Sequence, residues 1–224
     1  MPATQRCLAL TTLCLALNAH ATVLTFDGFG DNDSVPQSYG DRVVDFGTAY
    51  GSAGGITPNI VVAYVPVTNN IPLTNWVGDY ASLNNALSSI EFDTQGYVQL
   101  TPDPGYDVIL NSFQVAAWAD EAFPGSRIFV TQNSGGTLFD TGSFTFGPDV
   151  VETYPGSALR SSSSLRIHVQ DFGDLAIDNI AFSQVPTIPE PQTYALWVAG
   201  LGIVGLIASR SRRRGESSFR QRPK

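Results

Sequence analysis

The central part of the chain, residues 22–183, is built from short runs in which apolar and polar side chains alternate. In the run SLRIHV (164–169), Leu165, Ile167 and Val169 point one way and the polar residues between them point the other way. A period of two is the pattern of a β-strand with one buried face. Gly, Pro, Asn and Asp separate the runs, and the sequence of this region has no amphipathic helical stripe. The pattern therefore restricts this region to an all-β fold.

Ten such runs follow one another in this region, most of them 8–15 residues apart. Many short strands at this spacing are typical of an antiparallel β-sandwich or jelly roll. We expect a jelly-roll-like sandwich of this kind, with a single helical turn at 84–88 and a loop around Trp76. The expected strands lie at 23–27, 42–46, 60–65, 89–93, 97–101, 108–118, 127–131, 142–146, 164–169 and 175–182.

The first residues of the chain, 1–21, have the layout of a secretory signal peptide. Arg6 precedes the apolar run 7–17, and Ala19-His20-Ala21 fits a small-x-small cleavage site. We expect cleavage after Ala21; the alternative is a buried N-terminal helix. Both cysteines of the chain lie in this segment, so the mature protein is expected to have no disulfide and no cysteine nucleophile.

Charge is strongly segregated along the chain. Residues 22–188 contain fifteen Asp, three Glu and four basic residues, a net charge of −14, whereas the whole chain has a net charge of −8. Nucleic-acid binding depends on clusters of basic residues, so we exclude this class of partner. An acidic surface favours solubility and can hold divalent cations. The four basic residues are Arg42, Arg127, Arg160 and Arg166.

The C-terminal part of the chain has three consecutive segments. A stiff linker, 184–191, ends in a Pro-Glu-Pro triplet; an uncharged, mostly apolar segment, 192–209, follows it; and a basic tail, 210–224, closes the chain. The fifteen most apolar residues would rise about 22 Å as a helix, against a hydrocarbon core of about 30 Å. We expect a short transmembrane helix whose basic end stays in the cytoplasm. The arginines that stop the helix are Arg210, Arg212, Arg213 and Arg214.

The order of triplet, short helix and arginine cluster resembles the PEP-CTERM sorting domain of Gram-negative bacteria. The resemblance covers residues 189–214 and implies that Pro189, Glu190 and Pro191 are recognised by an exosortase, a membrane-embedded cysteine protease-transpeptidase. It also implies a passing inner-membrane intermediate, a final place at the cell surface or in the extracellular matrix, and a link to exopolysaccharide and biofilm. Ten residues follow the arginines, whereas the family usually ends promptly. The alternative is an ordinary tail anchor.

Acidic residues lie on the first and the last expected strand of the domain. Asp27 ends the first strand and Asp178 lies within LAIDNIAF (175–182). This layout resembles carbohydrate-binding-module-like jelly rolls, in which the first and last strands lie together. The resemblance implies that Asp27 and Asp178 hold a structural calcium ion, which takes six to eight oxygen ligands. The alternative is that each Asp caps a turn. No other cofactor is expected.

Four aromatic side chains are candidates for stacking on sugar rings, because amphipathic rings suit a half-wet site. They are Trp76, Tyr80, Tyr97 and Trp118. The alternative is that they belong to the core, where large rings are most often found. If they lie at the surface, the domain is expected to act as a carbohydrate-binding module that retains exopolysaccharide.

An enzymatic role has little support in the sequence. The run EFDTQ (91–95) is similar to the E-x-D-x-E active-site strand of a jelly-roll glycoside hydrolase family, but Gln95 replaces the last acid, and glycosidic hydrolysis needs two carboxylates. We expect a strand end there. His168, expected on the exposed face of its strand, has no companion motif for a triad. We therefore expect a non-enzymatic surface or matrix protein; the alternatives are a carbohydrate-binding module or, more weakly, a glycoside hydrolase.

Overall fold

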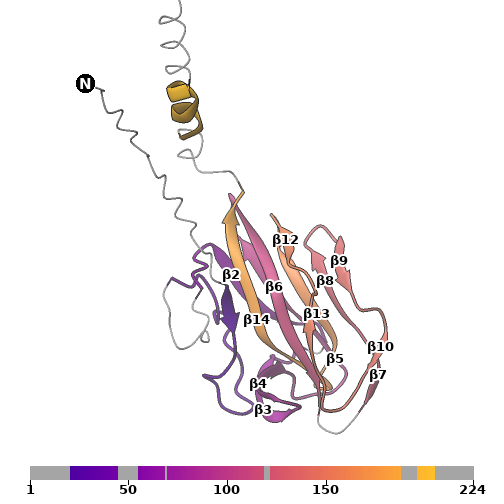
Figure 1. The fold of residues 1–224 in the computed structure, drawn as a ribbon. Helices are drawn as coiled ribbons and strands as arrows, with labels where there is room; N and C mark the ends of the chain where they lie inside the picture. Colours follow the sequence, from indigo (N-terminus) through magenta and orange to yellow (C-terminus); the bar gives the residue numbers. More distant parts are fainter. Residues whose placement is uncertain (1–20, 45–54, 69, 119–121, 188–195, 205–224) are drawn as a thin grey trace, which may run out of the picture.

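The computed structural model describes residues 21–44, 55–68, 70–118, 122–187 and 196–204. Its strands fall between Thr22 and Pro186, and a helix covers 196–204. The described part of the chain is therefore an all-β domain followed by one short helix (Figure 1). The strands are β1 (Thr22–Leu24), β2 (Ile60–Pro66), β3 (Thr74–Tyr80), β4 (Leu83–Ser88), β5 (Thr94–Pro102), β6 (Tyr106–Ala117), β7 (Phe123–Ser126), β8 (Ile128–Gln132), β9 (Thr137–Asp140), β10 (Phe144–Phe146), β11 (Val151–Tyr154), β12 (Leu159–Ser161), β13 (Leu165–Phe172) and β14 (Leu175–Pro186).

Twelve of the described strands form two antiparallel groups that face each other across a core, and β7 pairs with β10 in a separate two-stranded sheet. In the first group β14 pairs with β1, β4 and β6, and β6 pairs with β11 and β12. In the second group β5 lies between β2 and β13, and β8 lies between β13 and β9. The two groups join where β13 turns into β14, at a bridge between Phe172 and Leu175. Figure 1 shows β6 and β14 side by side through the middle of the domain.

Alternation along the strands builds the core, as the sequence predicts. In β13 Leu165, Ile167 and Val169 are buried, and Arg166 and His168 between them face outward. These apolar side chains belong to one buried cluster with residues of β6 and β14. Full burial of such a side chain is worth about 1.5–3 kcal/mol. The cluster therefore holds the two groups of strands together as a β-sandwich.

The first and the last strand of the domain lie side by side, which confirms that prediction. In this antiparallel pair Thr22 of β1 is opposite Phe182 of β14, and Leu24 is opposite Ile180. β14 also runs farther than expected, because its residues 184–186 pair with residues 106–108 of β6. The sandwich thus extends beyond residue 183, and the predicted start of the linker at Gln184 is wrong.

The hairpin formed by β3 and β4 is the main departure from the expected strands. Trp76 lies within β3, not in a loop, and residues 84–88 belong to β4, not to a helical turn. The expected strand at 89–93 is instead a turn that leads into β5, with Asp93 at a φ of 55°. Backbone pairing decides these elements, since β4 pairs with both β3 and β14.

Several predicted segments lie wholly or partly outside the described residues. Residues 1–20 of the predicted signal peptide are among them, as are the Pro-Glu-Pro triplet and the arginine cluster. Of the expected strand at 42–46, Val43 forms an isolated bridge with Thr57. Of the predicted transmembrane segment 192–209, the structure describes 196–204, which is helical. Among the described residues, no helix has both the length and the apolar character needed to cross a membrane.

Candidate functional site

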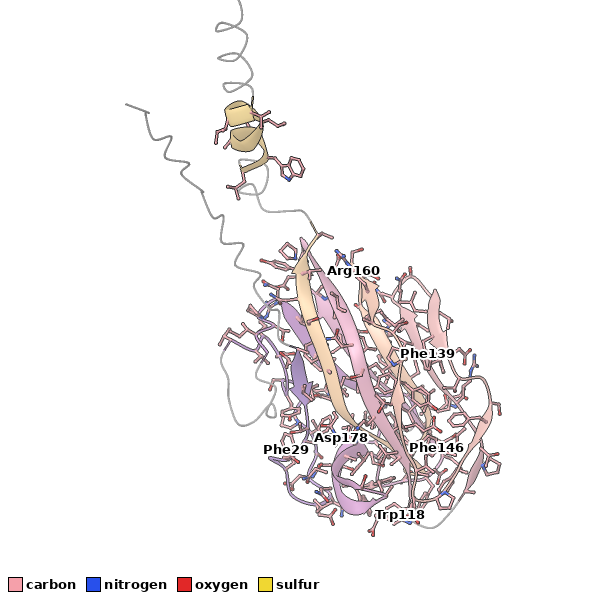
Figure 2. All side chains as sticks on the ribbon, viewed as in Figure 1. Phe29, Trp118, Phe139, Phe146, Arg160 and Asp178 are labelled. Atoms are coloured by element: carbon pink, nitrogen blue, oxygen red, sulfur yellow. The ribbon has the colours of Figure 1, made fainter. Side chains whose placement is uncertain are left out.

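A polar pocket of about 340 Å³ lies on the outer face of the first group of strands. Gln114 of β6 and Asp178 of β14 are opposite each other in register and face this pocket. The chain that follows β1 brings Asp27 to the rim, and the turn between β3 and β4 closes another side. The lining residues are Thr25, Asp27, Ser82, Leu83, Asn84, Gln114, Val151, Asp178 and Asn179. Figure 2 labels Asp178 at β14, near the β3–β4 hairpin.

Asp178 is the most perturbed group of this pocket. It is 5% exposed, and its Oδ2 accepts a hydrogen bond of 2.9 Å from Nδ2 of Asn179. Its Oδ1 is buried and has no hydrogen-bond partner among the described residues. Burial raises the pKa of Asp178 to about 8, and the negative charge of Asp27 adds to this rise. At neutral pH the carboxyl therefore keeps its proton unless a cation lies beside it.

The oxygen atoms of the pocket are of the kind that calcium accepts. The structure brings the two predicted ligands, Asp27 and Asp178, to one pocket together with the amides of Gln114 and Asn179. Calcium accepts carboxylate, amide and water oxygens, whereas zinc prefers histidine and cysteine. The described residues contain no group of three or more His, Cys, Asp or Glu placed to hold a metal ion. A calcium ion here would rest on two carboxylates and on neutral oxygens.

The predicted aromatic residues of the β3–β4 hairpin and β6 come together in one cluster. The ring of Trp118 lies 4.9 Å from that of Trp76, 5.3 Å from Tyr80 and 6.2 Å from Phe92, and each pair meets edge to face. Trp118 directly follows β6, at the end of the sandwich where β14 begins (Figure 2). Rings that meet at right angles do not share one flat surface. The cluster therefore seals the hairpin against the sheet and offers only small ring surfaces to a sugar.

Tyr80 is not at the surface, contrary to its predicted role in glycan binding. Its side chain is fully buried, and its hydroxyl donates a hydrogen bond of 2.6 Å to the carbonyl of Gly173. The same hydroxyl lies 2.7 Å from Oγ of Ser88. Tyr80 thus belongs to a buried cluster against which Trp118 packs. The cluster forms because β3 and β4 fold over the outer face of β6 and β14.

His168 lies on the outer face of β13, as predicted, but it is half-buried and not exposed. Its ring stacks on Phe129 with centroids 4.4 Å apart and planes 4° from parallel, and Nε2 lies 3.0 Å from Oγ1 of Thr131. Tyr97 flanks the other side at 5.0 Å. Burial, and then the charge of Arg166, lower the pKa of His168 to about 4. The imidazole is therefore neutral at physiological pH and belongs to an aromatic surface that the sequence analysis did not identify as a unit.

The acidic run at 91–95 forms a turn and the start of a strand. Oγ1 of Thr94 donates a hydrogen bond of 2.8 Å to the carbonyl of Glu91, and β5 begins at Thr94. Phe92 is 61% exposed at this turn. The predicted strand end at 91–95 is therefore wrong, because this segment is the turn that leads into β5 and not the end of a strand at 89–93.

Several solved structures with partial similarity to this chain contain carbohydrate-binding modules. The CBM22-1 xylan-binding domain of Paenibacillus barcinonensis Xyn10C has 11% identity and a TM-score of 0.38, and the match covers 71% of this chain and 99% of that one. TmCBM61 in complex with β-1,4-galactotriose has 12% identity and a TM-score of 0.31, covering 56% and 88%. The GH26-CBM35 β-(1,4)-mannanase of Podospora anserina has 14% identity and a TM-score of 0.33, covering 59% and 29%.

Curated proteins give no match to the chain. The family described as the PEP-CTERM protein-sorting motif matches residues 187–214. This match begins directly after the last residue of β14 and contains both the Pro-Glu-Pro triplet and the arginine cluster. The chain carries a PEP-CTERM sorting motif, as its sequence predicts.

Proposed function

We propose that this protein is an exported, non-enzymatic component of the cell surface or biofilm matrix, sorted and processed by an exosortase. The observation that carries the proposal is the PEP-CTERM motif at 187–214, which directly follows the last strand of the β-sandwich. In this proposal the β-sandwich is the exported domain and the C-terminal segment is its sorting signal. The predicted signal peptide starts export, and the tail holds the protein at the inner membrane until processing.

The described part of the tail supports a step at the membrane. The apolar side chains of the helix at 196–204 are each more than half exposed, from 55% for Ile203 to 71% for Val198. A continuous apolar surface of this kind is unfavourable in water and marks a site that contacts lipid or protein. The tail is therefore suited to a transient place in the membrane.

The polar pocket supports a binding role over a catalytic one. Asp27 and Asp178 line the same pocket, and glycoside hydrolysis uses a pair of carboxyl groups. However, Oδ1 of Asp178 is fully buried, and Oδ2 is bonded to Asn179. A polymer chain cannot bring its glycosidic oxygen to such a group. We assign the pair a structural role, in which a calcium ion would tie the chain after β1 to β14.

The sorting proposal is tested by the intact mass of the mature protein from its native host, with and without the exosortase. We expect the residues after the Pro-Glu-Pro motif to be lost only when the enzyme is present, and any added mass to identify the attached molecule. The double variant Pro189→Ala, Glu190→Ala should keep its tail, whereas the control Pro223→Ala, outside the motif match, should be processed normally. A chain that keeps residues 210–224 in both strains would show a simple tail anchor.

A second candidate function is retention of exopolysaccharide by the sandwich. Half-exposed aromatic side chains on the outer faces of the sheet favour it, since their rings can stack on sugars. A glycan array tests this function, and binding that is lost in Trp76→Ala or Trp118→Ala would place the sugar at the hairpin cluster. Turnover of a polysaccharide that is lost in Glu91→Gln would instead support a glycoside hydrolase.

A further inference from the structure

Arg166 differs from the other three arginines of the sandwich. Each of those three forms an ion pair with an aspartate, whereas within the described residues Arg166 has no carboxylate partner. This difference stands out in a domain of net charge −14, where carboxylates are plentiful. The three pairs are Arg42–Asp103, Arg127–Asp140 and Arg160–Asp107.

Neutral groups hold the guanidinium of Arg166 in place. Its Nε donates a hydrogen bond of 2.7 Å to Oε1 of Gln99, and Nη2 donates one of 2.8 Å to Oδ1 of Asn133. The guanidinium carbon also lies 5.2 Å from the centroid of the Tyr97 ring. Amide and ring contacts fix the orientation of the group but leave its charge uncompensated. Because a guanidinium has five N–H donors, several stay available to an anion.

Beside Arg166 runs a row of three rings, Tyr97, His168 and Phe129, which we name the aromatic strip. The three residues are opposite one another in register on β5, β13 and β8. Their neighbouring centroids are 5.0 and 4.4 Å apart. All three are partly buried on the outer face, and two strand spacings make the strip roughly 10 Å wide. His168 and Phe129 stack face to face, so the strip presents mainly ring edges to the solvent, and these edges carry the positive side of the ring quadrupole.

The aromatic strip also has polar groups and a hollow at its edge. A pocket of about 170 Å³ lies beside His168 and Phe129, and its other walls include Gln95 and Gln170. Their amides can exchange hydrogen bonds with hydroxyl groups. At the far end Arg127 lies over Phe129 at 4.9 Å, and Asp140 neutralises it through two hydrogen bonds. Arg166 is therefore the one uncompensated cation among the described side chains of this face.

We propose that the aromatic strip and Arg166 bind an acidic polysaccharide built from uronic acids. A sugar unit would lie across the ring edges of Tyr97 and His168, and its carboxylate would accept hydrogen bonds from Arg166. The local charge of Arg166 favours this ligand class, because a neutral sugar would leave the guanidinium without an anionic partner. The proposal gives the glycan-binding alternative a defined site and ligand class, and it does not depend on processing of the tail.

Isothermal titration calorimetry on the mature full-length protein tests the proposal. There are three probes: a galacturonic acid hexamer, the galactose hexamer that results when its carboxyl groups are reduced, and an acidic peptide of the same charge as the uronic acid hexamer. We expect the uronic acid hexamer to bind at least about tenfold more tightly than the other two, the size of effect of one charge-assisted hydrogen bond. Arg166→Gln should lose about tenfold, and Tyr97→Ala should also lose affinity.

Matched variants separate this site from the alternatives. Arg127→Gln, on the same face but already neutralised by Asp140, and Trp76→Ala, in the hairpin cluster, should each stay within about twofold of the parent protein. Equal binding of the galactose hexamer or the acidic peptide would overturn the proposal, as would an unchanged affinity in Arg166→Gln or the absence of all binding. None of these failures would bear on the sorting proposal, which depends on the mass measurement alone.

Discussion

The two outer faces of the sandwich follow the same strand alternation but have opposite surroundings. The β3–β4 hairpin covers part of the outer face of β6 and β14, where Ala116 and Ala176 are fully buried. The outer face of β5, β13 and β8 has no such cover among the described residues, and its side chains remain half-exposed. The β3–β4 hairpin thus helps to form a pocket on one sheet face, whereas the face without such a hairpin is a surface that a ligand can reach.

The polar groups of the two faces show the consequence of this difference. On the covered face Asp178 has a buried oxygen that finds no hydrogen-bond partner among the described residues, and burial raises the pKa of Asp178 to about 8. On the open face Arg166 and His168 have neutral partners, Gln99 and Thr131 among them. Among the described residues, the Asp178 carboxyl on the covered face has no cation partner, and the Arg166 guanidinium on the open face has no carboxylate partner. This contrast underlies the two binding proposals.

The largest expected effect comes from the core that both faces share. Phe172 is fully buried where β13 meets β14, and its ring packs so closely on Gly96 that a Cβ there would lie 3.1 Å from it. We expect Phe172→Ala to lower the free energy of unfolding by about 3–5 kcal/mol, because it leaves a cavity. Urea unfolding followed by tryptophan fluorescence and by far-UV circular dichroism measures this. Two separate unfolding transitions would contradict this prediction, since they would show that the two sheet faces do not share one core.

The next effect is specific to the covered face and depends on pH. The pKa of Asp178 is raised from 3.8 to about 8 in the folded protein, so the folded state binds a proton that the unfolded state releases between these values. Without calcium, the free energy of unfolding should therefore fall by about 2–4 kcal/mol as the pH rises from 4 to 8, which is less than the full shift allows because burial is incomplete. Chemical denaturation across this range measures the slope.

Two variants and added calcium test whether the Asp178 carboxyl causes this pH dependence. Asp178→Asn should remove most of this slope, whereas Asp149→Asn, at an exposed position, should leave it unchanged. Millimolar calcium should raise the melting temperature at pH 8 in the parent protein but not in Asp178→Asn, because an ion that binds only the folded state stabilises it. If calcium has no effect on the parent protein, the structural role of the ion is wrong.

The smallest effect belongs to the open face. The folded protein lowers the pKa of His168 to about 4, below its usual 6.5, so stability should be lost as the pH falls through this interval. After allowance for its partial exposure, we expect a loss of about 1 kcal/mol. Nuclear magnetic resonance titration of the imidazole measures its pKa directly, and His168→Gln is the matched variant for the stability curve. A value near 6.5 would mean that the ring is not packed between Phe129 and Tyr97.

Much of the fold was predictable because strand alternation is a local property. The pattern of SLRIHV predicts both the buried row of β13 and the outward position of Arg166 and His168. The β3–β4 hairpin was not predictable in this way, since LNNALS and TNWVGDY have turn-forming residues inside the strands. Their strand structure comes from pairing with each other and with β14, which is a tertiary effect.

The candidate sites divide along the same line. The resemblance to jelly rolls anticipated that Asp27 and Asp178 come together, and the pairing of β1 with β14 brings this about. The aromatic strip could not be predicted from the sequence, because residues that are paired across its strands lie about 40 and about 70 positions apart in the chain. Only the register of β5, β13 and β8 makes them neighbours. The prediction of Tyr80 as a surface residue was wrong because Tyr80 belongs to the β3–β4 hairpin, which packs this ring against the outer face of β6 and β14.

By itself, the sequence determined the all-β class, the strong acidity of the domain and the PEP-CTERM address, because periodicity, charge and a contiguous motif are all read along the chain. Tertiary structure alone decided which outward side chains are covered, which arginine lacks a carboxylate and which rings share a row. Those properties arise from strand register and from the packing of one element over another, so they depend on residues far apart in the chain.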